Sequence, residues 1–311
     1  MNTIKRKIIT VIVASLAAVL LVGPASANAA TANLTGSGSV AFSAYLVPIF
    51  KKYKQITKGK VNVTFNVKSG DLGVQDLKDG KADFAANARA PIPGSALDTG
   101  TAYIPTVRDG LGIVVNSANK VKKLSLQQVQ DIYLGKIKNW SEVGGADLAI
   151  TTSGRDTAAG QYGFFTQVVL GSTSAKKVNP AAGYKAFTLD TLVLNNVAAD
   201  PGAIGFAGQG FIKASKKYKS IALSSFSKPK KYFDLNEANV SKQVYPLWRF
   251  LYLVVRTKTL TSGKVGFDIS NSTAKLIDWL RYDYDAGRLF RKYGAVPYKQ
   301  ATHPPHKKKK K

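Results

Sequence analysis

The sequence predicts an α/β fold, because short apolar stretches typical of buried strands alternate with segments whose apolar residues recur at helical spacing. This alternation favours a parallel sheet covered by helices. Leaving both ends aside, the body has about 270 residues, which is enough for two lobes of ordinary domain size. Hydrophobic residues make up 45% of the chain and can supply a core.

The first part of the body contains successive strand–turn–helix steps. Residues 61–67 alternate apolar and polar side chains, as a half-buried strand does. Phe42, Leu46 and Ile49 recur at helical spacing, and the apolar run 82–86 ends at a proline-containing loop. We therefore expect strands at residues 33–40, 61–67 and 82–86, and helices at residues 40–53 and 73–80.

The second part continues the alternation. Residues 110–116 and 202–206 read as buried strands, and residues 245–255 are rich in β-prone side chains. Leu276, Trp279 and Leu280 fit the inner face of a helix, whereas the lysine-rich residues 213–231 predict a surface helix and strand. We further expect strands at residues 110–116, 149–152, 202–206 and 245–255, and helices at residues 126–134, 163–170 and 272–284.

The first 29 residues have the pattern of an export signal. Lys5, Arg6 and Lys7 precede an apolar stretch at residues 8–22, and small residues with the A-x-A spacing of a cleavage site follow. An uncleaved anchor is the alternative. The chain contains no cysteine, so no lipid can be attached to one after the signal. We expect a protein that is secreted, periplasmic or associated with the cell wall, and not lipid-anchored.

The chain is strongly basic throughout. Of its formal net charge of +27, three charges lie in the signal and five in residues 307–311, which leaves +19 on the rest. Residues 301–311 are expected to be a disordered basic tail. A basic exported body indicates anionic surroundings, such as wall polymer, lipid head groups or nucleic acid, or an anionic ligand.

The residue inventory excludes most catalytic chemistry. Both histidines, His303 and His306, lie in the tail, so the body has neither histidine nor cysteine. Histidine and thiol catalysis and the usual zinc sites are therefore excluded. We expect no enzyme, no cofactor and no metal, and a protein that acts by binding.

Three turns that follow strands and precede helices are rich in small and polar residues: residues 36–39, 69–70 and 156–160. The N-terminus of a helix offers unpaired N–H groups and the positive end of the helix dipole, glycine lets an anion approach, and serine adds a hydroxyl donor. Three such turns in one α/β chain, together with an arginine, indicate an anion site.

Several motifs carry a family resemblance. The run Ile132–Trp140, the loop Thr35–Ser39, the segment Pro201–Phe206 and the segment Tyr245–Leu247 with a following Leu-Tyr pair resemble the corresponding motifs of the PstS-type phosphate-binding proteins of ABC transporters. The resemblance covers about residues 33–297. It implies the type II periplasmic-binding-protein-like fold, in which two α/β lobes are joined by a hinge of crossing strands and the ligand binds between them.

On this resemblance we expect lobe I at residues 33–110 and 248–300, and lobe II at residues 111–247. The implied function is an exported solute-binding protein for phosphate or a related oxyanion, working with an ABC transporter permease. The alternative is an accessory or adhesion protein of the same fold that associates electrostatically with anionic wall polymer. The candidate ligand-binding residues are Ser37, Gly38, Ser39, Ser69, Gly70, Arg89, Arg155, Gly160 and Gln161.

The ligand loops depart from the family pattern. Ala159 and Gln161 stand where the family has serine and threonine, and Arg89 replaces the aspartate that accepts the proton of phosphate. Val40 and Ala41 replace a Thr-Phe pair. Losing two or three charge-assisted hydrogen bonds weakens phosphate binding by roughly 3 to 6 kcal/mol. The expected pocket is electropositive but has fewer donors than the family's.

Overall fold

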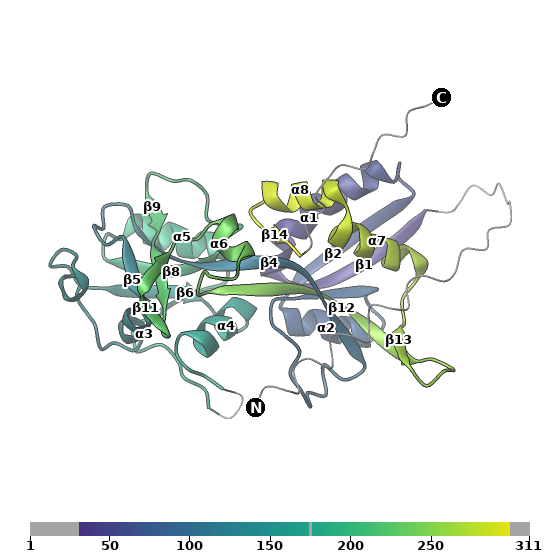
Figure 1. The fold of residues 1–311 in the computed structure, drawn as a ribbon, viewed down its shortest axis with the longest axis horizontal. Helices are drawn as coiled ribbons and strands as arrows, with labels where there is room; N and C mark the ends of the chain where they lie inside the picture. The colour runs from purple at the N-terminus through teal and green to yellow at the C-terminus, as the bar shows by residue number, and fades with distance from the viewer. Residues whose placement is uncertain (1–30, 174–175, 299–311) are drawn as a thin grey trace. The chain divides into compact units, whose positions relative to one another are not determined.

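Two long strands, β4 (Thr101–Asn116) and β12 (Trp248–Thr259), run antiparallel through the middle of the fold (Figure 1). The structure is a computed structural model that describes residues 31–173 and 176–298. The described residues all belong to one compact unit. The predicted signal and the basic tail lie outside them. Because β4 and β12 are shared by two groups of elements, they determine how the remaining strands join one sheet.

On the β12 side, the sheet continues as β3 (Phe84–Asn87), β1 (Ala32–Ser39) and β2 (Val61–Lys68). The strand β1 is parallel to both of its neighbours, and β3 pairs antiparallel with β12. The helices α1 (Val40–Ile56) and α2 (Gly70–Lys78) follow β1 and β2 directly. This part therefore has the strand–helix alternation that the sequence predicts.

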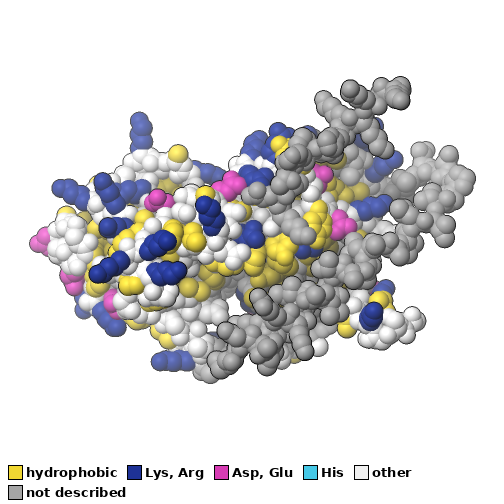
Figure 2. Space-filling view, in the orientation of Figure 1, with side chains coloured by type: hydrophobic (Ala, Val, Ile, Leu, Met, Phe, Trp, Pro, Cys, Tyr) yellow, Lys and Arg dark blue, Asp and Glu magenta, His cyan; other side chains and the backbone are white. Residues whose placement is uncertain are grey.

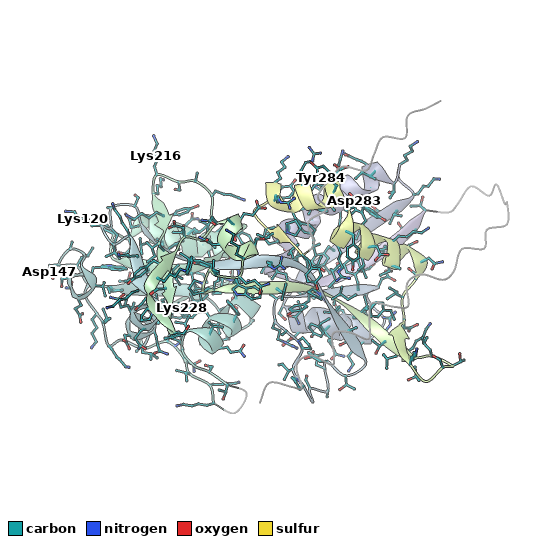
Figure 3. The ribbon with its side chains drawn as sticks, in the orientation of Figure 1. Lys120, Asp147, Lys216, Lys228, Asp283 and Tyr284 are labelled. Carbon is teal, nitrogen blue, oxygen red and sulfur yellow. The ribbon has the colours of Figure 1, made fainter. Side chains whose placement is uncertain are left out.

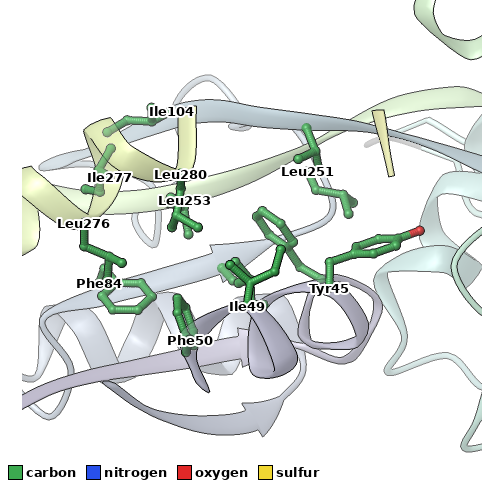
Figure 4. Close-up of a cluster of buried hydrophobic side chains, with 14 of the residues drawn as sticks. Tyr45, Ile49, Phe50, Phe84, Ile104, Leu251, Leu253, Leu276, Ile277 and Leu280 are labelled. Carbon is green, nitrogen blue, oxygen red and sulfur yellow. The ribbon is translucent and has the colours of Figure 1, made fainter. Parts of the chain in front are cut away.

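The first core lies around α1. Tyr45, Ile49 and Phe50 of this helix meet Phe84 and Leu251 of the sheet, and residues of the C-terminal helices complete the cluster (Figure 4). Each large apolar side chain that is buried completely contributes about 1.5–3 kcal/mol relative to an exposed one. The apolar residues of α1 recur at helical spacing because one face of the helix packs against this core.

On the other side of β4, the sheet continues as β8 (Ala203–Gly208), β6 (Thr151–Arg155) and β7 (Lys185–Phe187). The strand β8 is antiparallel to β4, whereas β6 is parallel to both β8 and β7. The helix α4 (Gly160–Val168) follows β6, and α5 (Asp190–Ala199) precedes β8. A second core, which includes Phe165 and Phe206 stacked at 4.2 Å between ring centroids, packs here.

A separate three-stranded sheet lies in the same part of the chain. Its order is β11 (Lys228–Phe233), β10 (Ala222–Ser225) and β5 (Lys123–Ser125). The remaining described elements are α3 (Leu126–Tyr133), η1 (Trp140–Val143), β9 (Tyr218–Ser220), α6 (Glu237–Ser241), β13 (Val265–Phe267), α7 (Asn271–Tyr282), α8 (Tyr284–Lys292) and β14 (Val296–Pro297).

The two cores divide the chain near the predicted lobe boundaries. The first core draws on residues 34–107 and 251–295, and the second draws on residues 111–247 and on Val296. The change falls within β4 and around the start of β12. The boundaries of lobes I and II therefore stay a proposal, which this division of the cores supports.

Three sequence-based expectations about the elements are wrong in detail. Residues 36–39 continue the strand β1 up to the helix and do not form a separate turn. The helices α2 and α4 each begin three residues earlier than predicted. Residues 213–231 contain no helix; Ile221 and Leu223 are both buried, and this alternation suits strands. The helices α5, α6 and α8 are additional to those expected.

A buried ion pair connects the shared strands to α1. Asp109 of β4 accepts hydrogen bonds from Arg249 of β12, at 3.0 Å from Nη2 and 3.2 Å from Nε, and from the Tyr45 hydroxyl at 2.8 Å. Arg249 also lies over the ring of Phe164 in α4, 5.3 Å from its centroid. Burial raises the pKa of Asp109 despite its two donors. This group of side chains therefore connects β4, β12, α1 and α4.

We predict that Asp109→Ala lowers the free energy of unfolding by about 3–5 kcal/mol, because it leaves the Arg249 guanidinium buried without its carboxylate. Urea denaturation of the purified protein measures the change. As a control, Asp268→Ala removes a carboxylate whose ion pairs with Lys258 and Arg256 are about half exposed; the cost there is below about 1 kcal/mol. Equal costs for the two variants would contradict the structural role of the buried pair.

Candidate functional site

A small cavity lies where the N-termini of α1, α2 and α4 meet. Its volume is about 90 Å³. One water molecule needs about 10–15 Å³ by the same measure, so the cavity can hold a small ion but no polymer or sugar chain. The residues that line it are Ser39, Val40, Ala41, Ser69, Gly70, Ala158, Ala159, Gly160 and Gln161.

Two serines begin the helices on one side of the cavity. The hydroxyl oxygen of Ser39 accepts the N–H of Phe42 in α1 at 3.3 Å, and that of Ser69 accepts the N–H of Leu72 in α2 at 3.3 Å. In each cap the oxygen acts as an acceptor, so the hydroxyl proton is left for another partner. Both serines can therefore donate a hydrogen bond into the cavity.

The helix α4 begins on the opposite side without a side-chain cap. Ala159 occupies its N-cap position, where it makes no capping hydrogen bond. Among the hydrogen bonds of the described residues, none uses the N–H of Gly160 or Gln161. Uncapped N–H groups at a helix start carry the positive end of the helix dipole. The start of α4 is therefore an open hydrogen-bond donor site.

The first N–H groups of α1 and α2 are free in the same way. Within the part of the chain that the structure describes, the N–H groups of Val40, Ala41 and Gly70 have no hydrogen-bond acceptor. A Cβ on Gly70 would lie 2.3 Å from Oδ1 of Asn87, so the close approach of the two chains requires glycine there. Together the starts of the three helices contribute five unpaired N–H groups and two hydroxyls, all on residues that line the cavity.

No charged side chain is among the lining residues. The described residues also contain no group of three or more histidine, cysteine, aspartate or glutamate side chains placed to hold a metal ion. The positive character of the cavity therefore comes from backbone N–H groups and helix dipoles. Such groups can bind an anion by hydrogen bonds, but they supply neither a nucleophile nor a general base.

Arg89, one of the two candidate arginines, lies away from the cavity lining. Its guanidinium makes a two-point contact with Asp98, at 2.8 and 3.0 Å, and donates from Nε to Asp71 at 2.8 Å. Burial lowers the pKa of Arg89, but the bonds with Asp98 and Asp71 outweigh burial and hold that pKa above its usual value. In this structure Arg89 joins α2 to the loop after β3.

Arg155 is almost fully buried and also has its own partners. Its Nη1 donates to Asp190 at 2.5 Å and to the side-chain oxygen of Gln161 at 2.7 Å, and its other nitrogens donate to the carbonyls of Phe187 and Thr188. Asp190 also accepts a hydrogen bond from Nε2 of Gln161 at 2.7 Å. The side chains of Arg155 and Gln161 thus hold the start of α4 against α5.

The structure separates the nine predicted site residues into two groups. Ser39, Ser69, Gly70, Gly160 and Gln161 line the cavity. The other four, Ser37, Gly38, Arg89 and Arg155, are not among its lining residues.

Ser37 and Gly38 have structural reasons to lie elsewhere. Ser37 is fully buried and donates its hydroxyl to Asp76 at 2.6 Å. Gly38 has φ +125°, and a Cβ there would lie 2.3 Å from the carbonyl oxygen of Ala86. Both residues fix the end of β1 from which α1 starts. Whether any of the nine binds a ligand stays a prediction.

Val40, Ala41, Ala158 and Ala159 line the cavity although the sequence argument did not select them. Their contribution is backbone, and any residue type can offer an N–H group, so their side chains carry no signal. Two indications existed: Ala158 and Ala159 lie within the turn 156–160, and the family resemblance placed Val40, Ala41 and Ala159 in the ligand loops. Asp190 was missed as well, because its role depends on a contact with Arg155 that is 35 residues away in the chain.

The sequence of this chain matches those of known proteins. The family described as the PBP superfamily domain matches residues 23–282. The phosphate-binding protein PstS of Pseudomonas aeruginosa is 26% identical over 74% of this chain and 74% of its own. PstS of Bacillus subtilis is 24% identical over 78% of this chain and 76% of its own.

Solved structures of phosphate-binding proteins superpose on this chain. An ABC-type phosphate transport receptor from Vibrio cholerae superposes with a TM-score of 0.67 at 26% identity, over 85% of this chain and 99% of its own. A putative phosphate ABC transporter substrate-binding protein from Clostridium perfringens, solved with bound phosphate, superposes with a TM-score of 0.71 at 19% identity. The match covers 86% of this chain and 100% of its own, and at this identity it supports the fold alone.

These matches confirm the α/β fold of the type II periplasmic binding proteins. Proteins of this family bind solutes and are not enzymes, and PstS-like members are extracytoplasmic. In the described residues, no helix is both long and apolar enough to cross a membrane. The chain therefore belongs to the PBP superfamily, as a distant homologue of the PstS phosphate-binding proteins of ABC transporters.

Proposed function

We propose that this protein binds phosphate or a related small oxyanion in the cavity between α1, α2 and α4 and delivers it to an ABC transporter permease. The observation that carries the proposal is the convergence of three helix N-termini on one cavity. Helix N-termini bind anions because their N–H groups lack partners and their dipoles point the positive end outward. The homology to PstS proteins supports the same ligand class.

The available donors are sufficient for useful affinity. A hydrogen bond to a charged group contributes about 1.5–3 kcal/mol. Binding at 10 µM requires about 7 kcal/mol. Two hydroxyls and a few of the five N–H groups can supply this even after the entropic cost of binding is subtracted. The missing serine and threonine side chains at Ala159 and Gln161 reduce the number of donors, but they leave the backbone donors in place.

The cavity has donors but few acceptors. No carboxylate and no histidine lines it, so a protonated oxyanion finds no strong partner for its own proton. A site of this kind selects by size and charge. It discriminates weakly between phosphate, which carries a proton near neutral pH, and sulfate, which carries none.

Calorimetry of the protein without the predicted signal at residues 1–29, at 150 mM salt, tests this function. We expect saturable binding of phosphate with a Kd of about 10 µM or tighter, and a sulfate Kd within about tenfold of it. No saturable heat with phosphate, sulfate or a phosphonate would contradict the proposal. Strong preference for phosphate over sulfate would contradict the donor-only selectivity and leave the binding function itself intact.

A substitution at the start of α4 separates binding from stability. Ala159→Asp supplies the missing N-cap, which stabilises a helix by about 0.5–2 kcal/mol, and it places a carboxylate beside the cavity. We predict a higher midpoint of thermal unfolding together with a loss of oxyanion affinity of at least a hundredfold, because the new carboxylate competes for the N–H groups and repels the ligand.

The matched control is Leu189→Asp. Leu189 also occupies an N-cap position without a side-chain hydrogen bond, at the start of α5, and its side chain is exposed and away from the cavity lining. This variant adds the same charge and the same kind of cap, and should keep its oxyanion affinity within about threefold. If Ala159→Asp bound phosphate as well as Leu189→Asp does, the cavity would not be the binding site.

A further inference from the structure

A second basic feature lies outside the cavity. Ten lysines fall in two segments, residues 117–125 and 213–233, and neither segment contains an aspartate or glutamate. These lysines, which we call the lysine surface, are Lys120, Lys122, Lys123, Lys213, Lys216, Lys217, Lys219, Lys228, Lys230 and Lys231.

The fold brings the two segments together although about 90 residues separate them. The strand β5 of the first segment pairs in parallel with β10 of the second, and β10 pairs with β11. Lys219 donates its ammonium to the backbone carbonyls of Ser117 and Asn119, which ties the segments at a second point. Figure 3 labels Lys120, Lys216 and Lys228 in this part of the molecule, and Figure 2 shows basic side chains across it.

The charges of the lysine surface are uncompensated. Among the ion pairs of the described residues, none involves any of the ten lysines. Elsewhere, lysines such as Lys68 and Lys258 do pair with carboxylates. Four of the ten lysines lie on the three-stranded sheet, at position 123 of β5 and positions 228, 230 and 231 of β11, and the others lie on β9 or on the loops of the two segments. Like charges gathered in this way repel one another and concentrate counterions around them. An anionic partner that displaces these counterions binds with an entropic gain.

From this arrangement we propose that the lysine surface binds a linear anionic polymer, with phosphate or carboxylate groups along a flexible chain. The partner is a polymer because ten dispersed ammonium groups match many anionic groups spaced along a chain, whereas one small ion can meet few of them. Lysine is a point charge on a flexible stem and requires no fixed geometry of its partner. The surface therefore suits a repeating polyanion of irregular shape.

The aromatic side chains of the surface argue against nucleobase recognition. Single-stranded nucleic acids are bound by stacking bases on free aromatic faces. Here the ammonium of Lys123 lies 4.8 Å from the ring centroid of Tyr232, and that of Lys231 lies 5.5 Å from that of Phe233. One face of each ring is thus already covered. Among the large hydrophobic side chains of the two segments, Phe226 is exposed. One exposed ring offers no row of faces on which successive bases could stack, and it is only a small apolar anchor for a membrane.

The lysine surface is separate from the proposed oxyanion site. None of its lysines lines the cavity, and a polymer cannot enter a volume of about 90 Å³. The two sites should therefore be occupied independently. Orthophosphate at concentrations that saturate the cavity should change the Kd for the polymer by less than about twofold. Because the two sites are measured with different ligands, loss of binding at one site can be detected while the other still binds.

Long-chain inorganic polyphosphate, labelled at one end, is a suitable probe. Fluorescence anisotropy on the protein without the predicted signal at residues 1–29 measures its Kd. The test variant carries Lys→Gln at positions 120, 216, 228 and 230, all exposed. The matched control carries Lys→Gln at positions 51, 52, 54 and 60, also exposed and lacking an ion pair among the described residues. Both keep residues 307–311, so any contribution of the tail is the same.

We expect the test variant to lose at least tenfold in polyphosphate affinity and the control to lose less than threefold. The wild-type affinity should fall about 50-fold or more between 50 and 200 mM salt, because roughly four or more phosphates release their counterions. Equal losses in the two variants would show that binding follows net charge, and would overturn the proposal.

Three other outcomes would also overturn it. The first is tighter binding of a single-stranded oligonucleotide than of polyphosphate of equal charge, which would assign the surface to nucleic acid. The second is binding of vesicles rich in anionic lipid without binding of polyphosphate, which would assign it to a membrane. The third is complete competition by orthophosphate, which would place the polymer end in the cavity.

Discussion

The fold depends on the buried contact between Asp109 and Arg249. These residues face each other on β4 and β12, the two strands that belong to both halves of the sheet. A buried ion pair is a weak source of net stability, but loss of one partner is costly, so the pair holds the register of the two strands. Through Tyr45 and Phe164 it also contacts α1 and α4. Two of the three helices that start at the cavity, α1 and α4, therefore contact the same buried ion pair.

Both candidate arginines are bound to other parts of the protein, and neither lines the cavity. Arg89 binds Asp98 and Asp71, and Arg155 binds Asp190 and Gln161. Arg89 meets Asp98 at two points, and every guanidinium nitrogen of Arg155 donates to a protein oxygen. A guanidinium with its donors occupied in this way has little left to offer a ligand, and moving it would leave a carboxylate unpaired. The cavity is consequently lined by neutral groups whose orientation is set by helices. The start of α4 stays in place because the ion pair of Arg155 and Asp190 behind it is buried.

The sequence predicted the fold well because the signals were local. The alternation in residues 61–67 and the helical spacing around Leu46 each determine one element, and the order of elements follows. It predicted the site only in part. Ser39 and Ser69 carry capping side chains and could be found, whereas the donors of Val40 and Ala41 belong to the backbone. The pairing of Arg155 with Asp190 depends on tertiary structure, which no local pattern encodes.

The lysine surface and the small cavity would attract anions by different physical means. The cavity depends on fixed dipoles and N–H groups at short range, which salt screens little when a ligand is enclosed. The lysine surface depends on mobile charges exposed to solvent, whose attraction extends about 8–10 Å at physiological salt. Neither arrangement can replace the other: neutral donors cannot hold a polymer in competition with salt, and flexible lysines cannot select a small ion by its shape. The basic character of the body is therefore a property of its surface, whereas the oxyanion recognition that we propose depends on three helix starts.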